Sequence, residues 1–251
     1  MPTRTVAIPT PDGTADAIVA APEGGGGHPA VLLYMDAFGL RPVIEEMAER
    51  LAAHGYCVLA PNVFYRTGPA PVLDLPDLEV PEERAAFISR VMPLIEAHTP
   101  ERAARDAEAY LEYLAARPEV RSGPVGVTGY CMGAVLAVRT AAAFPERVAA
   151  VGAFHPGPLV TDAADSPHRL AGALAAELHV GLAARDDGMP PEAIEEWTKA
   201  LDAAGVRHET EVYPDTVHGF TMSDTAAYSP AGRDRHWDRL LSLFARTLSA
   251  S

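Results

Sequence analysis

A cysteine flanked by two glycines is the residue whose surroundings most favour nucleophilic chemistry in this sequence. It stands in Gly129-Tyr130-Cys131-Met132-Gly133, after an apolar run of strand length and before a segment of helical period. A nucleophile raised above a sheet edge needs a strained backbone, so side chains two residues before and after it would collide with neighbouring backbone. The start of a helix favours an ionised thiol, and the Met132 N–H can point at an oxyanion. The motif therefore predicts that Cys131 is a catalytic nucleophile.

A nucleophile on such a turn needs a base and an acid that orients the base. Both are expected on loops after later strands, in the order nucleophile, acid, histidine. His218 comes just past the last expected strand and is the predicted base, with His155, at the end of an earlier strand, as its rival. Asp186 and Asp187 follow the strand before His218. Asp186 leaves the strand first and is the favoured acid, with Asp187 as the alternative.

The elements that must position these residues alternate between strand and helix. This alternation is typical of βαβ units and a mostly parallel sheet. We expect strands over residues 5–9, 16–22, 30–35, 56–61, 125–129, 148–154, 177–183 and 208–213, the first two forming a hairpin. We expect helices over 43–54, 81–98, 101–117, 132–144, 191–204 and 233–248, with one helical turn near 167–175.

This element order predicts an α/β-hydrolase fold, with a mostly parallel eight-stranded sheet and helices on both faces. A length of 251 residues is compatible with one domain spanning 1–251. A Rossmann plan is disfavoured, because the glycine run 24–27 precedes another strand and no helix N-terminus that could hold a phosphate. The run is expected to be a surface loop, and the proline-rich stretch 68–81 a lid or surface excursion.

With these residues assembled, the chain resembles the dienelactone hydrolase family, cysteine-dependent α/β-hydrolases that open lactone rings. The resemblance covers nearly the whole chain. It is carried by residues 33–39, 60–66 and 129–133, the Asp186 loop and His218-Gly219-Phe220.

The resemblance implies that the Ala37 and Met132 amides form an oxyanion hole. It also implies that Asp36 contacts the resting thiol and moves when substrate binds, although the family's best-known members carry the longer glutamate there. Those members hold the lactone's carboxylate with arginines, one of them four residues after the catalytic histidine, where this chain has Met222. A less charged lactone, ester or thioester is therefore at least as well supported as dienelactone.

Other positions near the expected site are candidates for binding substrate. Arg66 and Arg41 are candidate anion contacts, each of which could equally be a surface charge. The full set of expected substrate-binding residues is Asp36, Phe38, Arg66, Tyr130 and Met222.

Composition limits the partners and the compartment. The formal net charge of −14 and the absence of a basic block disfavour nucleic acids and anionic membranes. The N-terminus lacks the apolar core of a signal peptide, so we expect a cytoplasmic protein. Two cysteines give no disulfide framework, and Cys57 lies in an apolar strand, where a thiol is usually a small hydrophobe.

Three functions are compatible with these features. The leading prediction is a hydrolase that forms an acyl-thioester on Cys131 and acts on a small molecule, as a monomer or homodimer, without metal or organic cofactor. The same acyl-enzyme could instead deliver its acyl group to a hydroxyl or amine, as in an acyltransferase or cyclase. A non-catalytic binding protein would not need a thiol, an acid and a histidine together.

Overall fold

An eight-stranded sheet forms the centre of the protein, whose computed structural model describes residues 3–249. The strands are β1 (Arg4–Thr10), β2 (Gly13–Ala20), β3 (Ala30–Tyr34), β4 (Cys57–Pro61), β5 (Val125–Tyr130), β6 (Val148–Phe154), β7 (Glu177–Arg185) and β8 (His208–Val217). Their order is β1-β2-β4-β3-β5-β6-β7-β8. β2 pairs antiparallel with both β1 and β4. All other neighbouring strands, from β4 and β3 to β8, pair parallel. The predicted hairpin and mostly parallel sheet are confirmed.

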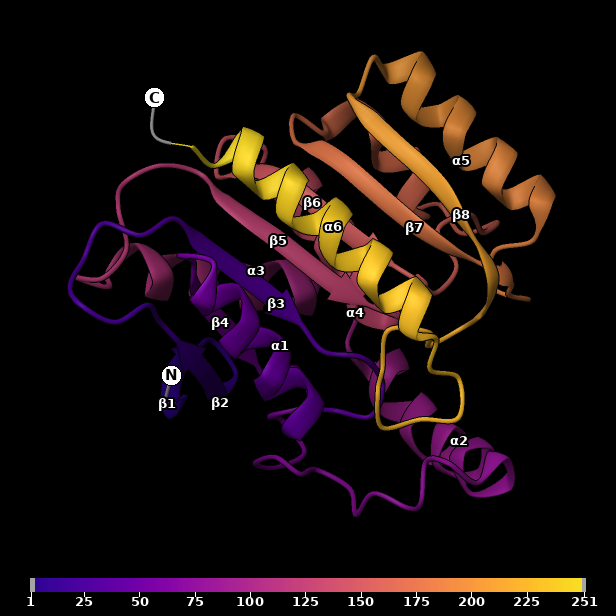
Figure 1. Ribbon diagram of the computed structural model, residues 1–251, viewed down its shortest axis with the longest axis horizontal. Helices are drawn as coiled ribbons and strands as arrows, with labels where there is room; N and C mark the ends of the chain where they lie inside the picture. Colours follow the sequence, from indigo (N-terminus) through magenta and orange to yellow (C-terminus); the bar gives the residue numbers. More distant parts are fainter. Residues whose placement is uncertain (1–2, 250–251) are drawn as a thin grey trace.

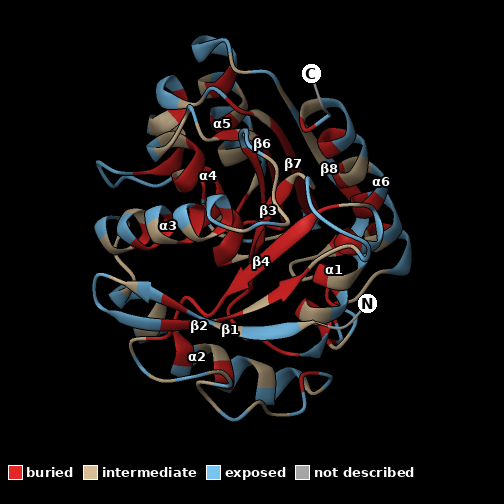
Figure 2. Ribbon diagram, turned by 90° about the vertical axis from the view of Figure 1, so that its left-hand side faces the viewer, coloured by how far each residue is buried: buried red, intermediate tan, exposed pale blue. Residues whose placement is uncertain are grey.

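Helices cover both faces of this sheet. They are α1 (Pro42–Ala53), α2 (Pro81–Ala97), α3 (Pro100–Ala115), α4 (Met132–Ala143), α5 (Pro191–Ala204) and α6 (Pro230–Thr247), with a 3₁₀ helix η1 (Pro167–Ala173). α1 and α6 lie on one face, α3 and α4 on the other, and α5 packs beside η1 (Figure 1). Figure 2 shows how burial is concentrated in the strands between these layers. All residues of β3, β4 and β5 are buried, as expected for parallel strands covered on both sides.

Proline sets where most helices begin. All except α4 start at a proline, whose fixed φ suits the first helical position and whose missing N–H is not needed there. The prediction for the last helix was wrong by three residues, because Pro230 starts it and the Ser229 hydroxyl caps the Gly232 N–H. Among residues 3–249, no helix combines the length and apolarity that crossing a membrane requires.

The last strand also differs from the prediction in a way that matters for the site. β8 continues to Val217 and does not end at Tyr213, with an irregular register against β7 between Ala183 and Arg185. The periodicity breaks at Pro214 and Asp215, which made the strand seem to stop early. The extension places His218 directly after β8.

Candidate active site

The turn between β5 and α4 holds Cys131 in a conformation that only small neighbours permit. Cys131 has φ 55° and ψ −119°, outside the regions that side chains normally occupy. A Cβ at Gly129 would overlap the Gly133 carbonyl, and one at Gly133 would overlap the Met35 carbonyl oxygen. Both glycines are therefore required by backbone that approaches from neighbouring segments, and the thiol stands at the N-terminus of α4.

His218 and Asp186 form a hydrogen-bonded pair beside this thiol. The Nδ1 atom of His218 lies 2.7 Å from Oδ2 of Asp186, whose side chain is only 6% exposed. Burial alone would lower the pKa of His218, but its interactions with Asp186 and Cys131 outweigh burial and raise that pKa to about 10. With Nδ1 engaged by the acid, Nε2 is the nitrogen available to the sulfur. The alternative acid, Asp187, is exposed.

The rival histidine packs against this pair, and among residues 3–249 its side chain is hydrogen-bonded to a hydroxyl and to no acid. His155 is fully buried, and its ring centroid lies 5.3 Å from that of His218. Its Nε2 is 2.8 Å from the hydroxyl of Thr221. Burial, together with the nearby His218, holds the pKa of His155 well below its usual value. A neutral imidazole paired with a hydroxyl supports the orientation of His218 and does not replace it.

The backbone amides expected to bind an oxyanion lie on either side of Cys131. Met132 is the first residue of α4, so its N–H has no acceptor within the helix. Ala37 follows β3 and lines a cavity together with Cys131 and His218. Met132 lines the adjoining cavity along α4, which also contains Cys131, so the two amides come from segments that both border the thiol. Amides contributed by two different segments are the usual components of an oxyanion hole.

Asp36 lies in the wall of that cavity, yet its charge is already compensated. Arg41 donates two hydrogen bonds to it, of 2.6 and 3.0 Å, and the Phe38 N–H donates a third of 3.0 Å. Arg41 also pairs with Asp224 at 2.6 Å and is itself buried. Asp36 is therefore held by Arg41, and its contact with the thiol stays a prediction. Arg41 is removed from the candidate anion contacts, because both of its charged partners are already in place.

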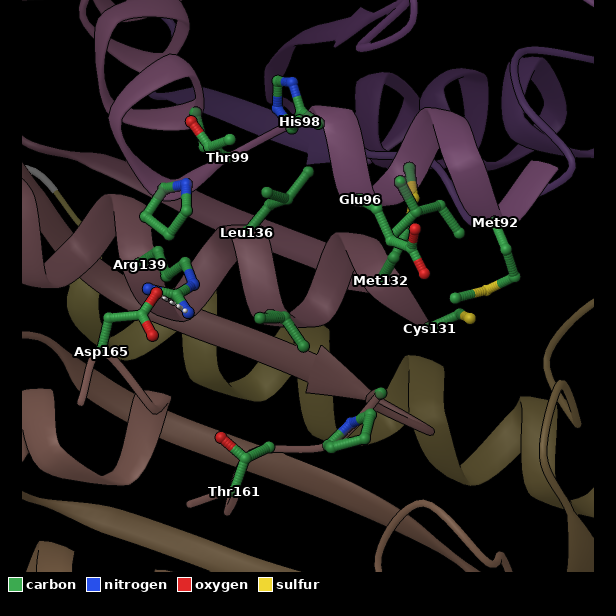
Figure 3. A pocket seen from close by; sticks show the side chains of 16 residues that line it. Met92, Glu96, His98, Thr99, Cys131, Met132, Leu136, Arg139, Thr161 and Asp165 are labelled. Carbon is green, nitrogen blue, oxygen red and sulfur yellow. Dashed lines mark hydrogen bonds and ion pairs between the residues drawn. The ribbon is translucent and has the colours of Figure 1, made fainter. Parts of the chain in front are cut away.

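Two cavities meet at Cys131. The His218 cavity, about 470 Å³, contains Ala37, Phe38, His218 and Met222 in its wall. The α4 cavity, about 590 Å³, runs along α4 and includes Met132, Val135, Leu136 and Arg139 (Figure 3). Met92 and Ile95 of α2 line both cavities. The thiol is thus accessible from two directions.

Two expected substrate-binding residues lie elsewhere. Arg66 forms ion pairs with Asp106 at 2.8 Å and Asp12 at 2.7 Å, and it lines neither cavity that contains Cys131. Tyr130 is fully buried beneath the turn, with its hydroxyl 2.9 Å from Nε2 of His236. The prediction that these two residues bind substrate is therefore corrected, because their polar groups already have protein partners.

Arg84 is a candidate that the sequence analysis missed. It lies in the first turn of α2 and lines the His218 cavity. Its Nη1 atom is buried and has no hydrogen-bond partner among residues 3–249. A helix over 81–98 was expected, but the sequence does not show which face of that helix meets the thiol. A buried, unpartnered guanidinium nitrogen beside the nucleophile is a natural contact for an anionic group.

Within the part of the chain that the structure describes, one group of side chains has metal-ligating chemistry. His179, Glu209 and Glu211 lie close to one another on β7 and β8. The carboxylates are engaged by Arg239 and Arg235, which satisfies their charge without an ion. This cluster is remote in sequence from Cys131 and lines neither cavity.

Comparisons with known proteins identify the family and the fold. The model of the dienelactone hydrolase family matches residues 15–248. A carboxymethylenebutenolidase from Rhodococcus opacus is 30% identical over 236 residues, covering 92% of this chain and 85% of the relative. Among solved structures, a Klebsiella pneumoniae protein assigned to the dienelactone hydrolases is 25% identical, with a TM-score of 0.82 and 98% coverage of both chains. A dienelactone hydrolase-like promiscuous phosphotriesterase from metagenomic libraries shares the fold, with 24% identity, a TM-score of 0.80 and 98% coverage of both chains.

Proposed function

The chain belongs to the dienelactone hydrolase family and is a hydrolase, and from this premise we propose that it cleaves lactones, esters or thioesters through Cys131. The observation that carries the proposal is the hydrogen-bonded pair of Asp186 and His218 beside a thiol at the head of α4. A protonated imidazole stabilises an anionic sulfur next to it.

The reaction follows from where the groups lie. The Cys131 sulfur attacks the acyl carbon, a C–S bond forms, and the carbonyl electron pair moves to oxygen, facing the Ala37 and Met132 amides. Collapse of this intermediate breaks the bond to the leaving group, which takes the proton from His218. In a lactone the leaving oxygen stays attached, so the product of this step is a hydroxyacyl-enzyme.

Hydrolysis of the acyl-thioester then releases the free cysteine. His218 removes a proton from water as the water oxygen attacks the acyl-thioester. The second tetrahedral intermediate collapses with cleavage of the C–S bond, releasing the acid and restoring the thiolate and imidazolium. Asp186 keeps the ring in the required tautomer through both steps.

Arg84 adds a preference to this function. We expect it to receive an anionic group of the substrate in the His218 cavity, because Nη1 is buried there without a partner. This replaces the expectation of neutral substrates that Met222 suggested. Met222 itself is buried in the same wall and offers an anion no donor.

Trapping the intermediate tests the proposal directly. The protein is mixed with p-nitrophenyl acetate, quenched in acid within one turnover and digested. The masses of the peptides are then measured by mass spectrometry. We expect one acetyl group on the peptide that carries Cys131, and its disappearance on longer incubation before the quench. Steady hydrolysis by Cys131→Ala at the parent rate, with no acetylated peptide in the parent, would refute the cysteine mechanism.

A further inference from the structure

The α4 cavity borders the nucleophile on the side away from the catalytic base. Its floor is one face of α4, since Cys131, Val135 and Leu136 are spaced so that they share a face of the helix, and Arg139 continues that face by one turn. Met92 of α2 lies across from this face (Figure 3), and Ile95 of the same helix also lines the cavity. The cavity is therefore an elongated space that starts at the reactive sulfur.

The need for proton transfer to and from His218 determines which part of the substrate lies on each side of Cys131. A leaving oxygen or sulfur must reach His218 to be protonated, and the hydrolytic water must reach the same nitrogen to be deprotonated. His218 and Ala37 line the His218 cavity, and within residues 3–249 neither lines the α4 cavity. The leaving group and the water therefore belong on the His218 side, which leaves the α4 cavity for the acyl chain.

The wall of the α4 cavity is suited to an uncharged chain. Val135, Leu136, Ile95 and Ala103 supply hydrocarbon along it. Glu96 also lines the cavity, but its side chain is exposed, so its carboxylate keeps contact with solvent. Burial lowers the pKa of His98 to about 4, so this imidazole in the wall is neutral near pH 7. Arg139 forms an ion pair of 3.2 Å with Asp165 at the end farther from Cys131, and the Asp165 side chain is 52% exposed.

The length of the cavity sets the length of the chain. From Cys131 to Arg139 the helix advances eight residues, or about 12 Å at 1.5 Å per residue. Three bonds of an extended chain span about 3.6 Å, so about ten bonds fill this distance. A longer chain would meet the Arg139–Asp165 pair and would have to enter solvent.

We propose that the α4 cavity is an acyl-binding pocket for unbranched apolar chains of about eight to ten carbons, so that the enzyme acts on medium-chain esters or thioesters. The proposal rests on the proposed function, because it requires an acyl group on Cys131. It assigns the two ends of the substrate to opposite sides of the nucleophile. The acyl chain lies along α4 and the leaving group lies near His218.

Two isomeric esters test this assignment. Ethyl octanoate and octyl acetate have the same composition, but they place the long chain on the acyl side and on the alcohol side, respectively. We expect the parent enzyme to prefer ethyl octanoate in kcat/KM by at least about tenfold, since each buried methylene is worth about a three- to fourfold gain. Equal rates, or a preference for octyl acetate, would overturn the acyl pocket.

Matched variants fill one cavity or the other. Leu136→Trp fills the α4 cavity, so it should remove the preference for ethyl octanoate over octyl acetate. Val135→Trp repeats the test in case Leu136→Trp lowers the melting temperature. Ile88→Trp fills the His218 cavity and should slow octyl acetate more than ethyl octanoate. If both α4 variants kept the full preference for ethyl octanoate, the assignment would also fail.

The two proposals fail in different ways. Loss of the acyl pocket would leave p-nitrophenyl acetate hydrolysis dependent on Cys131, with no gain for the octanoyl ester. Failure of the proposed function would appear as acetate hydrolysis that survives Cys131→Ala. The acetate assay on that variant therefore separates the two results.

Discussion

The two cysteines of this chain lie at opposite ends of parallel strands in the same sheet and in opposite environments. Cys57 begins β4 and is completely buried, and burial, with Glu119 nearby, raises the pKa of its thiol. Cys131 follows β5, is partly exposed, and faces a histidine whose pKa is raised to about 10. Their backbones differ as much as their surroundings, since Cys57 is ordinary strand and Cys131 is in a strained turn. Access, a neighbouring cation and a helix terminus distinguish a reactive thiol from a packing residue.

Removing each sulfur gives the largest expected difference. Cys131→Ala should lower kcat/KM for p-nitrophenyl acetate by at least about a thousandfold, because no other nucleophile stands on the turn. Cys57→Ala leaves a small gap in the core and should stay within about threefold in activity, with some loss of melting temperature. Steady-state kinetics and thermal denaturation measure both. The reverse pattern would break the comparison.

The acid that orients the base gives the next largest effect. Asp186→Asn should lower kcat by about 10²- to 10⁴-fold, because the amide holds the imidazole in the wrong tautomer. Asp187→Asn is the matched control, one residue away and exposed, and should stay near the parent. Equal, mild losses in both variants would show that neither carboxylate orients His218.

The charge beside Cys131 gives an intermediate effect. Arg84→Gln should weaken kcat/KM for a carboxylated lactone by about ten- to a hundredfold and change that of its methyl ester little, because a charge-assisted hydrogen bond is lost. Arg66→Gln serves as a control, since Arg66 is held by Asp106 and Asp12. If Arg66→Gln and Arg84→Gln changed the acid-to-ester ratio equally, Arg84 would not be the anion contact.

The smallest expected effect is on stability. The pKa of His218 is raised to about 10 from an ordinary 6.5, so folding favours its protonated form. This contribution is complete below about pH 6.5 and is lost as pH rises through 10. The parent's melting temperature should therefore fall relative to that of His218→Gln between pH 7 and 10. The ring is 36% exposed, so we expect a difference of only about 2 °C. Parallel curves would argue against the raised pKa.

Local patterns in the sequence predicted most of the fold. Strand-length apolar runs, helical spacing and the Gly129-to-Gly133 motif depend on residues close in the chain, and each appears where expected. Prediction was poorer at boundaries, where a single cap such as Ser229 or a strand irregularity at Asp215 decides the outcome. Cys131 was predicted from its flanking glycines, and Asp186 and His218 from their positions after strands. The structure brings the three residues together.

The charged residues around the site could not be placed in the same way. Arg41 pairs with Asp224, which is 183 residues away, so no local pattern indicates that its charge is already engaged. Arg66 likewise pairs with Asp106, which is 40 residues away, so no local pattern indicates that its charge is engaged. Arg84 is spaced like any solvent-facing residue of a helix start. Which charges remain available to a substrate depends on tertiary pairing, and this information lies outside periodicity.

The backbone around the nucleophile has a consequence for how this protein can acquire heat tolerance. Among residues 3–249, the non-glycine residues with positive φ are Cys131, His155 and Asp215. The first two line the His218 cavity, and the third lies three residues before His218. Conformations of this kind each cost about 1–3 kcal/mol. Substitutions that let these residues adopt ordinary backbone angles would raise the free energy of unfolding. The same substitutions would lower turnover, because they would displace the catalytic side chains. Stabilising substitutions that preserve catalysis therefore belong far from this edge of the sheet, for example in the hairpin of β1 and β2.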